Sequence, residues 1–388
     1  MKKIPIFIVC GKSPWTSLGG GYGKYTLSLL KVLKKIGHKV FTIHLDKNVN
    51  VTALPILPFY SLILSRKIEK ICVQKKYQKI IVWGIGPWGL AGAILKRKLK
   101  NKVILINNYF TSVKHEWEGM LKCLKVSDYG LLRKIQYLFL FFTLQPVLTC
   151  LEEYLLHKAD LIIVNYQSTQ NILIRQFKLK KYKFFHSSFF LETEKTEVPG
   201  PMSQKLPRTF ILTVVRHDPR KGINILLHAY KILIDKGYKI PLVIVGTGEL
   251  FKANIKLAFR LGISSWVKFL GYVRDTTPLM KKAKLFCLPS LEEGAGSIAI
   301  NEAMMYGLPI VSTNIDGISE DIINKKNGIL FKAGNSNDLA MQIKYLLDNP
   351  NCANTLGKTA RKIYSEKFTQ RKMIEDTQRL LTLSLKSK

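Results

Sequence analysis

The chain has 388 residues, more than one hydrophobic core normally serves, so two domains are expected. Its 47% hydrophobic and 22% charged residues exclude a disordered chain, and its six cysteines include no C-x-x-C pair, which excludes a cysteine zinc cluster. The 61 basic residues outnumber the 26 acidic ones and give a net charge of +35, which favours a polyanionic partner such as nucleic acid or anionic lipid.

The first half of the chain alternates short apolar runs with amphipathic segments. Residues 4–10 predict a buried strand and not a signal peptide, because the apolar run is short. A glycine-rich turn at Gly19, Gly20 and Gly21 then leads into a helix with one apolar face, which Gly37 ends. Further apolar runs predict strands at 40–45, 79–83, 103–106 and 160–164. Fully apolar strands between helices indicate a parallel sheet that is covered on both faces.

One apolar run, residues 135–151, raises the question of a membrane span. Its 17 uncharged residues reach only the lower limit for a spanning helix, and Pro146 interrupts it. We therefore expect a pair of helices there, either buried or lying on the surface.

The second half repeats the alternation after a linker. Residues 197–208 hold three prolines and a glycine, which is typical of a linker. Apolar runs then predict strands at 209–215, 241–245, 266–270, 285–288, 308–312 and 328–331. The expected fold class is α/β, with two facing, doubly wound, Rossmann-like domains at 1–200 and 206–364. Ligands of such sheets bind at the carboxyl ends of the strands.

The glycine-rich turn near the start is not a known phosphate-binding fingerprint. The nucleotide-hydrolase loop would need glycine where Leu18 stands and a small hydroxyl residue where Tyr25 stands. The dinucleotide fingerprint would need its third glycine at Thr26. An anion site at the start of the following helix and an ordinary strand-to-helix turn both stay open.

Cationic and glycine-rich segments follow the strands of the second half. Arg216 and Lys221 come directly after a strand and suit a diphosphate, although two solvated surface cations can have the same spacing. A Gly246-x-Gly248 turn follows the next strand. Further along, an acidic, glycine-rich turn leads into a helix that carries Glu302, and such a turn can bind an anion.

Six segments of the second half occur in an order that is similar to one enzyme family. They are "RHDPRKG", "GTGEL", "VKFLGYV", "LPSLEEGAG", "NEAMMYGLPIV" and "DGISEDIINKKNGILF". This order resembles the GT-B-fold retaining glycosyltransferases of family 4 (glycosyl transferases group 1). The resemblance implies two facing Rossmann-like domains and a C-terminal helix, 365–388, that crosses back to the first domain. It also implies transfer of a sugar from a UDP- or GDP-sugar to a glycan or lipid-linked acceptor with retention of configuration. The reaction that the resemblance implies needs no cofactor and no metal.

The resemblance assigns a role to each candidate residue. Glu293 is expected at the transferred sugar, Glu302 at the ribose hydroxyls, and the glycine turn at 19–21 on the acceptor side. The residues expected to bind the donor are Arg216, Lys221, Gly246, Gly271, Tyr272, Val273, Gly294, Gly296, Ser297 and Glu302.

Several positions depart from the family pattern. Eight residues separate Glu293 from Glu302, where the family has seven, so either the turn bulges or Glu293 is displaced. Asn107 and Asn108 stand where a histidine is common, and His115 is the nearest histidine that could reach the cleft as a catalytic group. A structural loop histidine is the alternative for that residue. No Asp-x-Asp motif occurs, which disfavours the metal-dependent sugar transferases of the other common fold.

The positive charge predicts where the chain works. Basic clusters fall at 66–70, 95–102 and 178–183, and no RNA-reading motif or zinc finger accompanies them. We therefore expect a cytoplasmic protein, peripheral on the inner face of a bacterial membrane, where it meets its acceptor. Three alternatives remain open: a nucleic-acid-binding protein, a sugar-nucleotide epimerase, and a non-catalytic member of the family.

Overall fold

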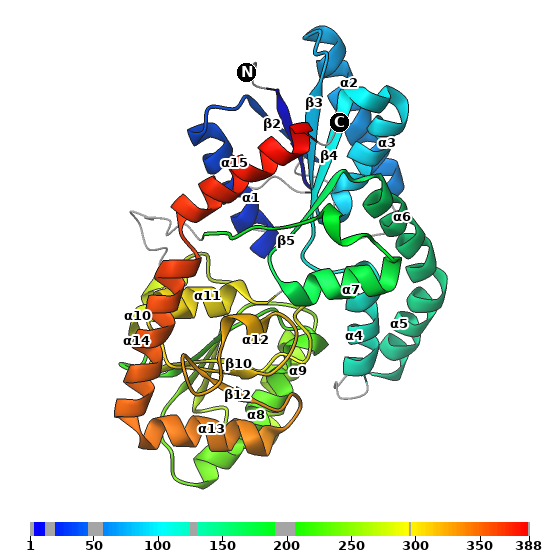
Figure 1. The fold of residues 1–388 in the computed structure, drawn as a ribbon. Coiled ribbons are helices and arrows are strands. Elements are labelled where there is room, and N and C mark those ends of the chain that lie inside the picture. Colours follow the sequence, from blue (N-terminus) through cyan, green and yellow to red (C-terminus); the bar gives the residue numbers. More distant parts are fainter. Residues whose placement is uncertain are drawn as a thin grey trace. The chain divides into compact units, whose positions relative to one another are not determined.

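The computed structural model describes residues 4–11, 20–45, 57–124, 130–190, 206–294 and 296–386. They form two compact units (Figure 1). Unit 1 comprises Met1–His115, Phe139–Glu192 and Phe368–Lys388, and unit 2 comprises Glu116–Leu138 and Thr193–Lys367. Residues 116–138 therefore group with the second unit, although they precede the linker in sequence.

Unit 1 is built on a parallel sheet of six strands in the order β2-β1-β3-β4-β5-β6. The apolar runs at its centre, IFIV in β1 and IIVWGI in β3, are buried along their whole length. The strands are β1 (Ile6–Val9), β2 (Val40–Ile43), β3 (Ile80–Ile85), β4 (Val103–Asn108), β5 (Leu161–Val164) and β6 (Phe184–His186). The five strands expected from the sequence are confirmed, and β6 is an addition to them.

Helices connect the strands of this sheet. The α-helices of unit 1 are α1 (Gly20–Lys35), α2 (Leu57–Gln74), α3 (Leu90–Leu99), α6 (Gln145–Lys158), α7 (Gln167–Phe177) and α15 (Gln370–Lys386). Between β4 and α6 the chain forms α4 (Val113–Leu124) and α5 (Leu131–Thr143), most of whose residues group with unit 2. The short 3-10 helices are η3 (Gly86–Gly89), η4 (Lys100–Lys102) and η5 (Lys181–Lys183).

The prediction of a glycine-rich turn before α1 is wrong for Gly20 and Gly21, because both residues belong to the first turn of the helix. Gly19, the third residue of the predicted turn, lies outside the described residues. Each helical glycine costs about 1 kcal/mol relative to alanine. Burial of Tyr25, Leu29 and other residues of the apolar face outweighs this cost, because tertiary packing supplies most of a helix's stability.

The last helix, α15, packs within unit 1 beside α1 (Figure 1). The Asp376 carboxylate accepts a hydrogen bond from the Ser188 amide at 2.9 Å, and the Arg379 guanidinium lies 4.9 Å from the centre of the Phe185 ring. Helix α15 therefore belongs to the same unit as β1 and α1.

Unit 2 holds the second parallel sheet, in the order β12-β11-β10-β7-β8-β9. The strands are β7 (Ile211–Val214), β8 (Leu242–Val245), β9 (Val267–Gly271), β10 (Leu285–Leu288), β11 (Ile310–Thr313) and β12 (Ile329–Phe331). The helices are η6 (Pro219–Lys221), α8 (Ile223–Asp235), α9 (Phe251–Arg260), α10 (Thr277–Lys282), α11 (Ile298–Met305), α12 (Ile318–Asp321), α13 (Ser336–Asp348) and α14 (Pro350–Lys367). All six strands expected in this half are confirmed, and with them the α/β fold of two doubly wound sheets.

The strand order of unit 2 reverses between β7 and β10. From β7 the chain runs outward through β8 and β9, and it then returns to pair β10 with the other side of β7. The loops that follow β7 and β10 therefore meet at one edge of the sheet, which is where open α/β sheets bind ligands.

The apolar run at 135–151 falls on α5 and α6, as the expected pair of helices. No single helix among the described residues is long and apolar enough to cross a membrane. Within the same part of the chain, only this pair, bent by 44° at its break, passes the length and composition test when its two helices are taken together.

Gly92 provides a test of the packing of α3 on the sheet of unit 1. A Cβ there would lie 2.7 Å from Cγ1 of Val82 and 2.6 Å from Cδ1 of Leu105. Gly92→Ala should therefore lower the free energy of unfolding by about 1–3 kcal/mol, although alanine favours a helix. Urea denaturation measures the change. Gly130→Ala is the control, because a Cβ at Gly130 meets nothing within 4 Å; equal stability of the two variants would contradict the tight packing.

Candidate active site

The loops after β7 and β10 are joined at the backbone. The amides of Leu291 and Glu292 donate to the Arg220 carbonyl at 2.6 and 3.3 Å. Gly222 has φ +58°, and a Cβ there would lie 2.1 Å from the Pro289 carbonyl oxygen. This position therefore requires glycine, both for its backbone conformation and for the close approach of the two loops.

Lys221 and Glu293, two of the residues singled out from the sequence, form an ion pair at this junction. Their Nζ and Oε1 atoms are 2.8 Å apart, with only 14% and 8% of the side chains exposed. The Ser290 hydroxyl donates to the same Glu293 oxygen at 2.5 Å. The backbone of the turn is held by Asp316, whose Oδ2 accepts from the amides of Glu293 and Gly294 at 2.9 and 3.2 Å. The site thus has a largely buried lysine whose position is set before any ligand binds.

Arg216 lies differently from Lys221. Its side chain is 69% exposed and pairs with Asp218 at 3.1 Å. Asp218 also accepts a hydrogen bond from the Arg220 amide at 3.1 Å and caps η6. The sequence-predicted cation pair therefore consists of a largely buried lysine that pairs with Glu293 and an exposed arginine that pairs with Asp218.

A buried arginine that sequence reasoning missed lies beside this pair. Arg220 NH1 is 2.9 Å from Glu292 of the β10 loop and 2.7 Å from Glu116 of α4, and its Nε is 3.6 Å from Asp218. The three carboxylates outweigh the effect of burial and hold the pKa of Arg220 well above its ordinary value. Arg220 directly precedes Lys221 in the segment RHDPRKG, and this adjacency is the one signal of it in the sequence.

The pKa of the Glu292 carboxyl group is higher than that of an ordinary glutamate. Burial raises its pKa to about 7, and Arg220 and Lys221 offset only part of that effect, while Glu116 and Asp316 raise it further. Glu292 therefore binds or releases a proton near neutral pH.

The Gly246-x-Gly248 turn serves the packing of the β7 loop. Gly246 has φ +127°, and a Cβ there would lie 1.9 Å from the Val215 carbonyl oxygen. A Cβ on Gly248 would lie 2.5 Å from the His217 carbonyl oxygen. Contact of Gly246 with a donor remains a prediction.

His217 fixes the base of the same loop. It is fully buried, its ring lies 4.9 Å from that of Phe251, and its Nδ1 accepts from the Asn254 amide group at 3.0 Å. Burial lowers the pKa of His217 to about 4, so the ring is neutral at physiological pH. Its part is therefore structural.

The remaining donor candidates lie in unit 2. Glu302 is buried in α11 and accepts a hydrogen bond from the Thr276 hydroxyl at 3.2 Å. Ser297 is the N-cap residue of α11, and Tyr272 is 55% exposed just after β9. Gly271, Gly294 and Gly296 have positive φ values of 67°, 66° and 58°. Val273 follows Tyr272, and Ala295, between the last two glycines, lies outside the described residues.

The candidates of unit 1 are half-buried or internally bonded. The His115 amide donates to the Ser112 hydroxyl at 2.9 Å in the first turn of α4. Asn107 donates to the Gly86 carbonyl at 3.0 Å, and the Asn108 side chain accepts from the Tyr25 hydroxyl. The side chains of these two asparagines therefore make hydrogen bonds within unit 1. A catalytic role of His115 remains a prediction.

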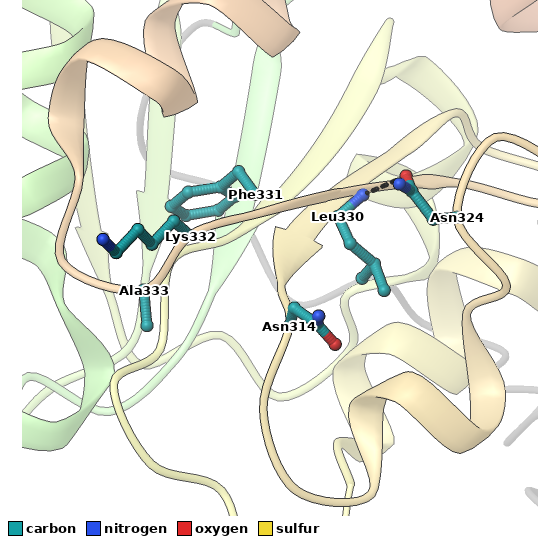
Figure 2. Close-up of a pocket in the computed structure, with 6 residues that line it drawn as sticks. All are labelled: Asn314, Asn324, Leu330, Phe331, Lys332 and Ala333. Atoms are coloured by element: carbon teal, nitrogen blue, oxygen red, sulfur yellow. Dashed lines mark hydrogen bonds between the residues drawn. The ribbon is translucent and has the colours of Figure 1, made fainter.

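A separate pocket lies at the β12 edge of the unit 2 sheet (Figure 2). It has a volume of about 480 Å³ and contains the Asn324 side chain, which accepts from the Leu330 amide at 2.9 Å. The lining residues are Asn314, Asn324, Leu330, Phe331, Lys332 and Ala333. None of the sequence-predicted site residues is among them.

The proton on Glu292 should make stability depend on pH. The folded protein keeps this proton up to about pH 7, whereas the unfolded chain loses it near pH 4.5, so Glu292 contributes stability below pH 4.5 that is lost as the pH rises to 7. Glu292→Gln cannot ionise and should gain stability relative to the wild type across this window, by on the order of 3 kcal/mol at most. Urea denaturation at several pH values measures the difference, and Glu366→Gln on the exposed surface of α14 is the control. A pH-independent difference for Glu292→Gln would contradict the raised pKa.

Comparisons with known proteins agree with this architecture. Residues 197–363 match the family model of glycosyl transferases group 1. An uncharacterized glycosyltransferase of Haemophilus influenzae is 26% identical over 98% of this chain and 100% of that protein. Sucrose-phosphate synthase from Thermosynechococcus elongatus superposes with a TM-score of 0.77 at 18% identity over the whole of both chains. Anabaena Alr3699/HepE in complex with UDP-glucose gives a TM-score of 0.71 at 19% identity over 98% and 99% of the two chains.

The two solved structures show the fold, and the family model identifies the domain that carries the loops after β7 and β10. Residues 197–363 thus form a domain that matches the glycosyl transferases group 1 family, and the chain has the GT-B fold.

Proposed function

We propose that the chain transfers a sugar from a UDP- or GDP-sugar to a glycan or lipid-linked acceptor, with retention of configuration. The observation that carries this proposal is the buried Lys221–Glu293 pair at the point where the sheet of unit 2 reverses. The likeness to Anabaena Alr3699/HepE, which is bound to UDP-glucose, supports a nucleotide-sugar donor.

Lys221 and Arg216 are the groups that would bind the donor's diphosphate. Negative charge grows on this group as the bond to the sugar breaks, so cations that are already in place stabilise the transition state more than the ground state. The Lys221 ammonium is held by Glu293, and the exposed Arg216 can move toward a ligand. Two cations that neutralise the leaving group make a metal ion unnecessary in this proposal.

Glu293 and Glu302 would bind the sugar-bearing parts of the donor. Glu302 lies in α11 with its carboxylate on the Thr276 hydroxyl, and we assign it to the ribose hydroxyls. Glu293 lies beside Lys221, and we assign it to the transferred sugar. The third candidate, His115, would act on the acceptor side.

We further propose that the enzyme works at an anionic membrane surface on the cytoplasmic side, where a lipid-linked acceptor would be found. The net charge of +35 supports this proposal. Part of the basic charge is already neutralised within unit 1, where Lys96 pairs with Asp160 at 2.7 Å and Lys98 with Glu69 at 2.5 Å. Nucleic acid is the less favoured polyanion, because the family of residues 197–363 is a glycosyltransferase family.

Replacement of the two cations tests the diphosphate assignment. Arg216→Ala should lower kcat/KM by roughly ten- to a hundredfold, because a charged hydrogen bond contributes about 1.5–3 kcal/mol, and it should leave stability within about 0.5 kcal/mol. Lys221→Ala should lower kcat/KM at least as much, and it should also lower stability because the buried Glu293 loses its cation. Steady-state kinetics with UDP- and GDP-sugars measure both variants, with Lys231→Ala on α8 as the control. Near wild-type kinetics for both variants would refute the assignment.

The two glutamates should differ in their importance. Glu302→Gln should reduce turnover more than Glu293→Gln, because only Glu302 keeps the family's position on the helix. Transfer and donor binding are measured separately for each variant. Equal, severe losses would mean that both carboxylates reach the donor despite the longer spacing. Unchanged transfer in both variants would contradict the assigned roles.

A further inference from the structure

Helix α5 presents an apolar face that nothing among the described residues buries. The helix has no buried residue along its whole length. Leu131, Leu132, Ile135 and Leu138 are 73%, 85%, 52% and 44% exposed. At 100° per residue these side chains fall on one face of the helix, and the exposed aromatic residues Phe139 and Phe142 extend the same face.

The opposite face of α5 is anchored within unit 2. Arg133 NH2 lies 3.1 Å from Oε2 of Glu249, and the Tyr137 hydroxyl donates to both oxygens of the same carboxylate at 2.8 and 3.0 Å. Arg133 and Tyr137 are one turn apart and point away from the apolar face. Glu249 follows the Gly246-x-Gly248 turn. The anchor therefore fixes which face of α5 is turned to the surroundings.

A pocket with both apolar and basic walls lies between α4 and α5. Its volume is about 570 Å³. Three leucines form its apolar part, two lysines bring positive charge, and one glutamate offsets part of that charge. The lining residues are Glu118, Leu121, Lys122, Leu124, Lys134 and Leu138. A hydrocarbon chain next to a phosphate group has the chemistry that complements these walls.

We propose that α5 and the pocket beside it form a docking site for an anionic phospholipid bilayer. In this site the apolar face of α5 enters the interface, and Lys122 and Lys134 bind a lipid phosphate at the mouth of the pocket. This inference rests on the proposed function and makes it more specific. It locates the membrane contact on α5, the helix that Glu249 anchors, and not on the basic clusters of α2 and α3.

Sedimentation with vesicles tests the site. The probes are phosphatidylcholine vesicles and phosphatidylcholine vesicles that contain phosphatidylglycerol, each at low and at physiological salt. Leu132→Glu with Ile135→Glu should lower binding to the anionic vesicles at least about tenfold. The matched control is Ile255→Glu with Phe259→Glu, which alters two exposed apolar residues one turn apart on α9 and should lower binding much less.

A second pair of variants distinguishes phosphate binding by Lys122 and Lys134 from a general electrostatic attraction of the basic protein to anionic lipid. Lys122→Ala with Lys134→Ala should lower binding about tenfold or more. Lys252→Ala with Lys256→Ala removes the same charge from exposed positions of α9 and should have a clearly smaller effect. Equal losses from the two lysine pairs, or equal binding of the wild type to neutral and anionic vesicles, would overturn the proposal.

Two further measurements separate lipid docking from nucleotide binding and from self-association. Calorimetric titration should give the same affinity for UDP and GDP in the wild type and in the α5 variants. Loss of lipid binding with intact nucleotide binding would then support the docking site independently of the proposed function. Absence of nucleotide binding in the wild type would count against the proposed function alone. Analytical ultracentrifugation should show the same molecular mass for the wild type and for Leu132→Glu with Ile135→Glu. A wild-type dimer that this variant dissociates would show that a second copy of the chain covers α5, and the bilayer proposal would then be wrong.

Discussion

Two neighbouring, largely buried ion pairs hold together the loops on which the candidate site depends. Lys221 binds Glu293 and Arg220 binds Glu292, so consecutive residues of the β7 loop meet consecutive residues of the β10 loop. Removal of charged groups from water is costly, and in both pairs this cost is offset by a cation that meets a carboxyl group at hydrogen-bond distance. Such an arrangement leaves the loops little freedom to shift separately.

The strand order of unit 2 makes these pairs possible. β7 and β10 are neighbours in the sheet although about 70 residues of chain, with two further strands, separate them. Gly222 then lets the two loops approach until backbone atoms touch. The chemistry at the junction therefore depends on a long-range pairing of strands, and the local motif supplies only the side chains.

Sequence patterns were a good guide to what is local or periodic. Apolar runs identified eleven of the twelve strands that the described residues form, because the central strands of a parallel sheet are buried on both faces and the other strands are also rich in apolar residues. The strand they missed, β6, has only three residues and a half-exposed pattern. The family motif led to Lys221 and Glu293, which the structure brings into contact.

The interactions that the sequence did not reveal link residues far apart in the chain. Nothing in the sequence indicated that Arg220 is buried, because its partner Glu116 lies 104 residues earlier and no local pattern connects them. The anchoring of Arg133 and Tyr137 by Glu249 was hidden for the same reason. The opposite happened at Gly20 and Gly21, where the glycine content predicted a turn and the structure has a helix, whose apolar face buries Tyr25 and Leu29.

The charge balance around the buried arginine has a thermodynamic consequence. The carboxylates that surround the loop cations outnumber them: Glu116, Asp218, Glu292, Glu293 and Asp316 stand against Arg216, Arg220 and Lys221. Glu292, whose pKa is about 7, is the group among them that can shed its charge near neutral pH. An anion that enters this neighbourhood raises that pKa further and draws a proton from solution. Ligand binding and proton uptake are then one linked equilibrium, and the heat of binding carries the ionisation enthalpy of whichever buffer supplies the proton.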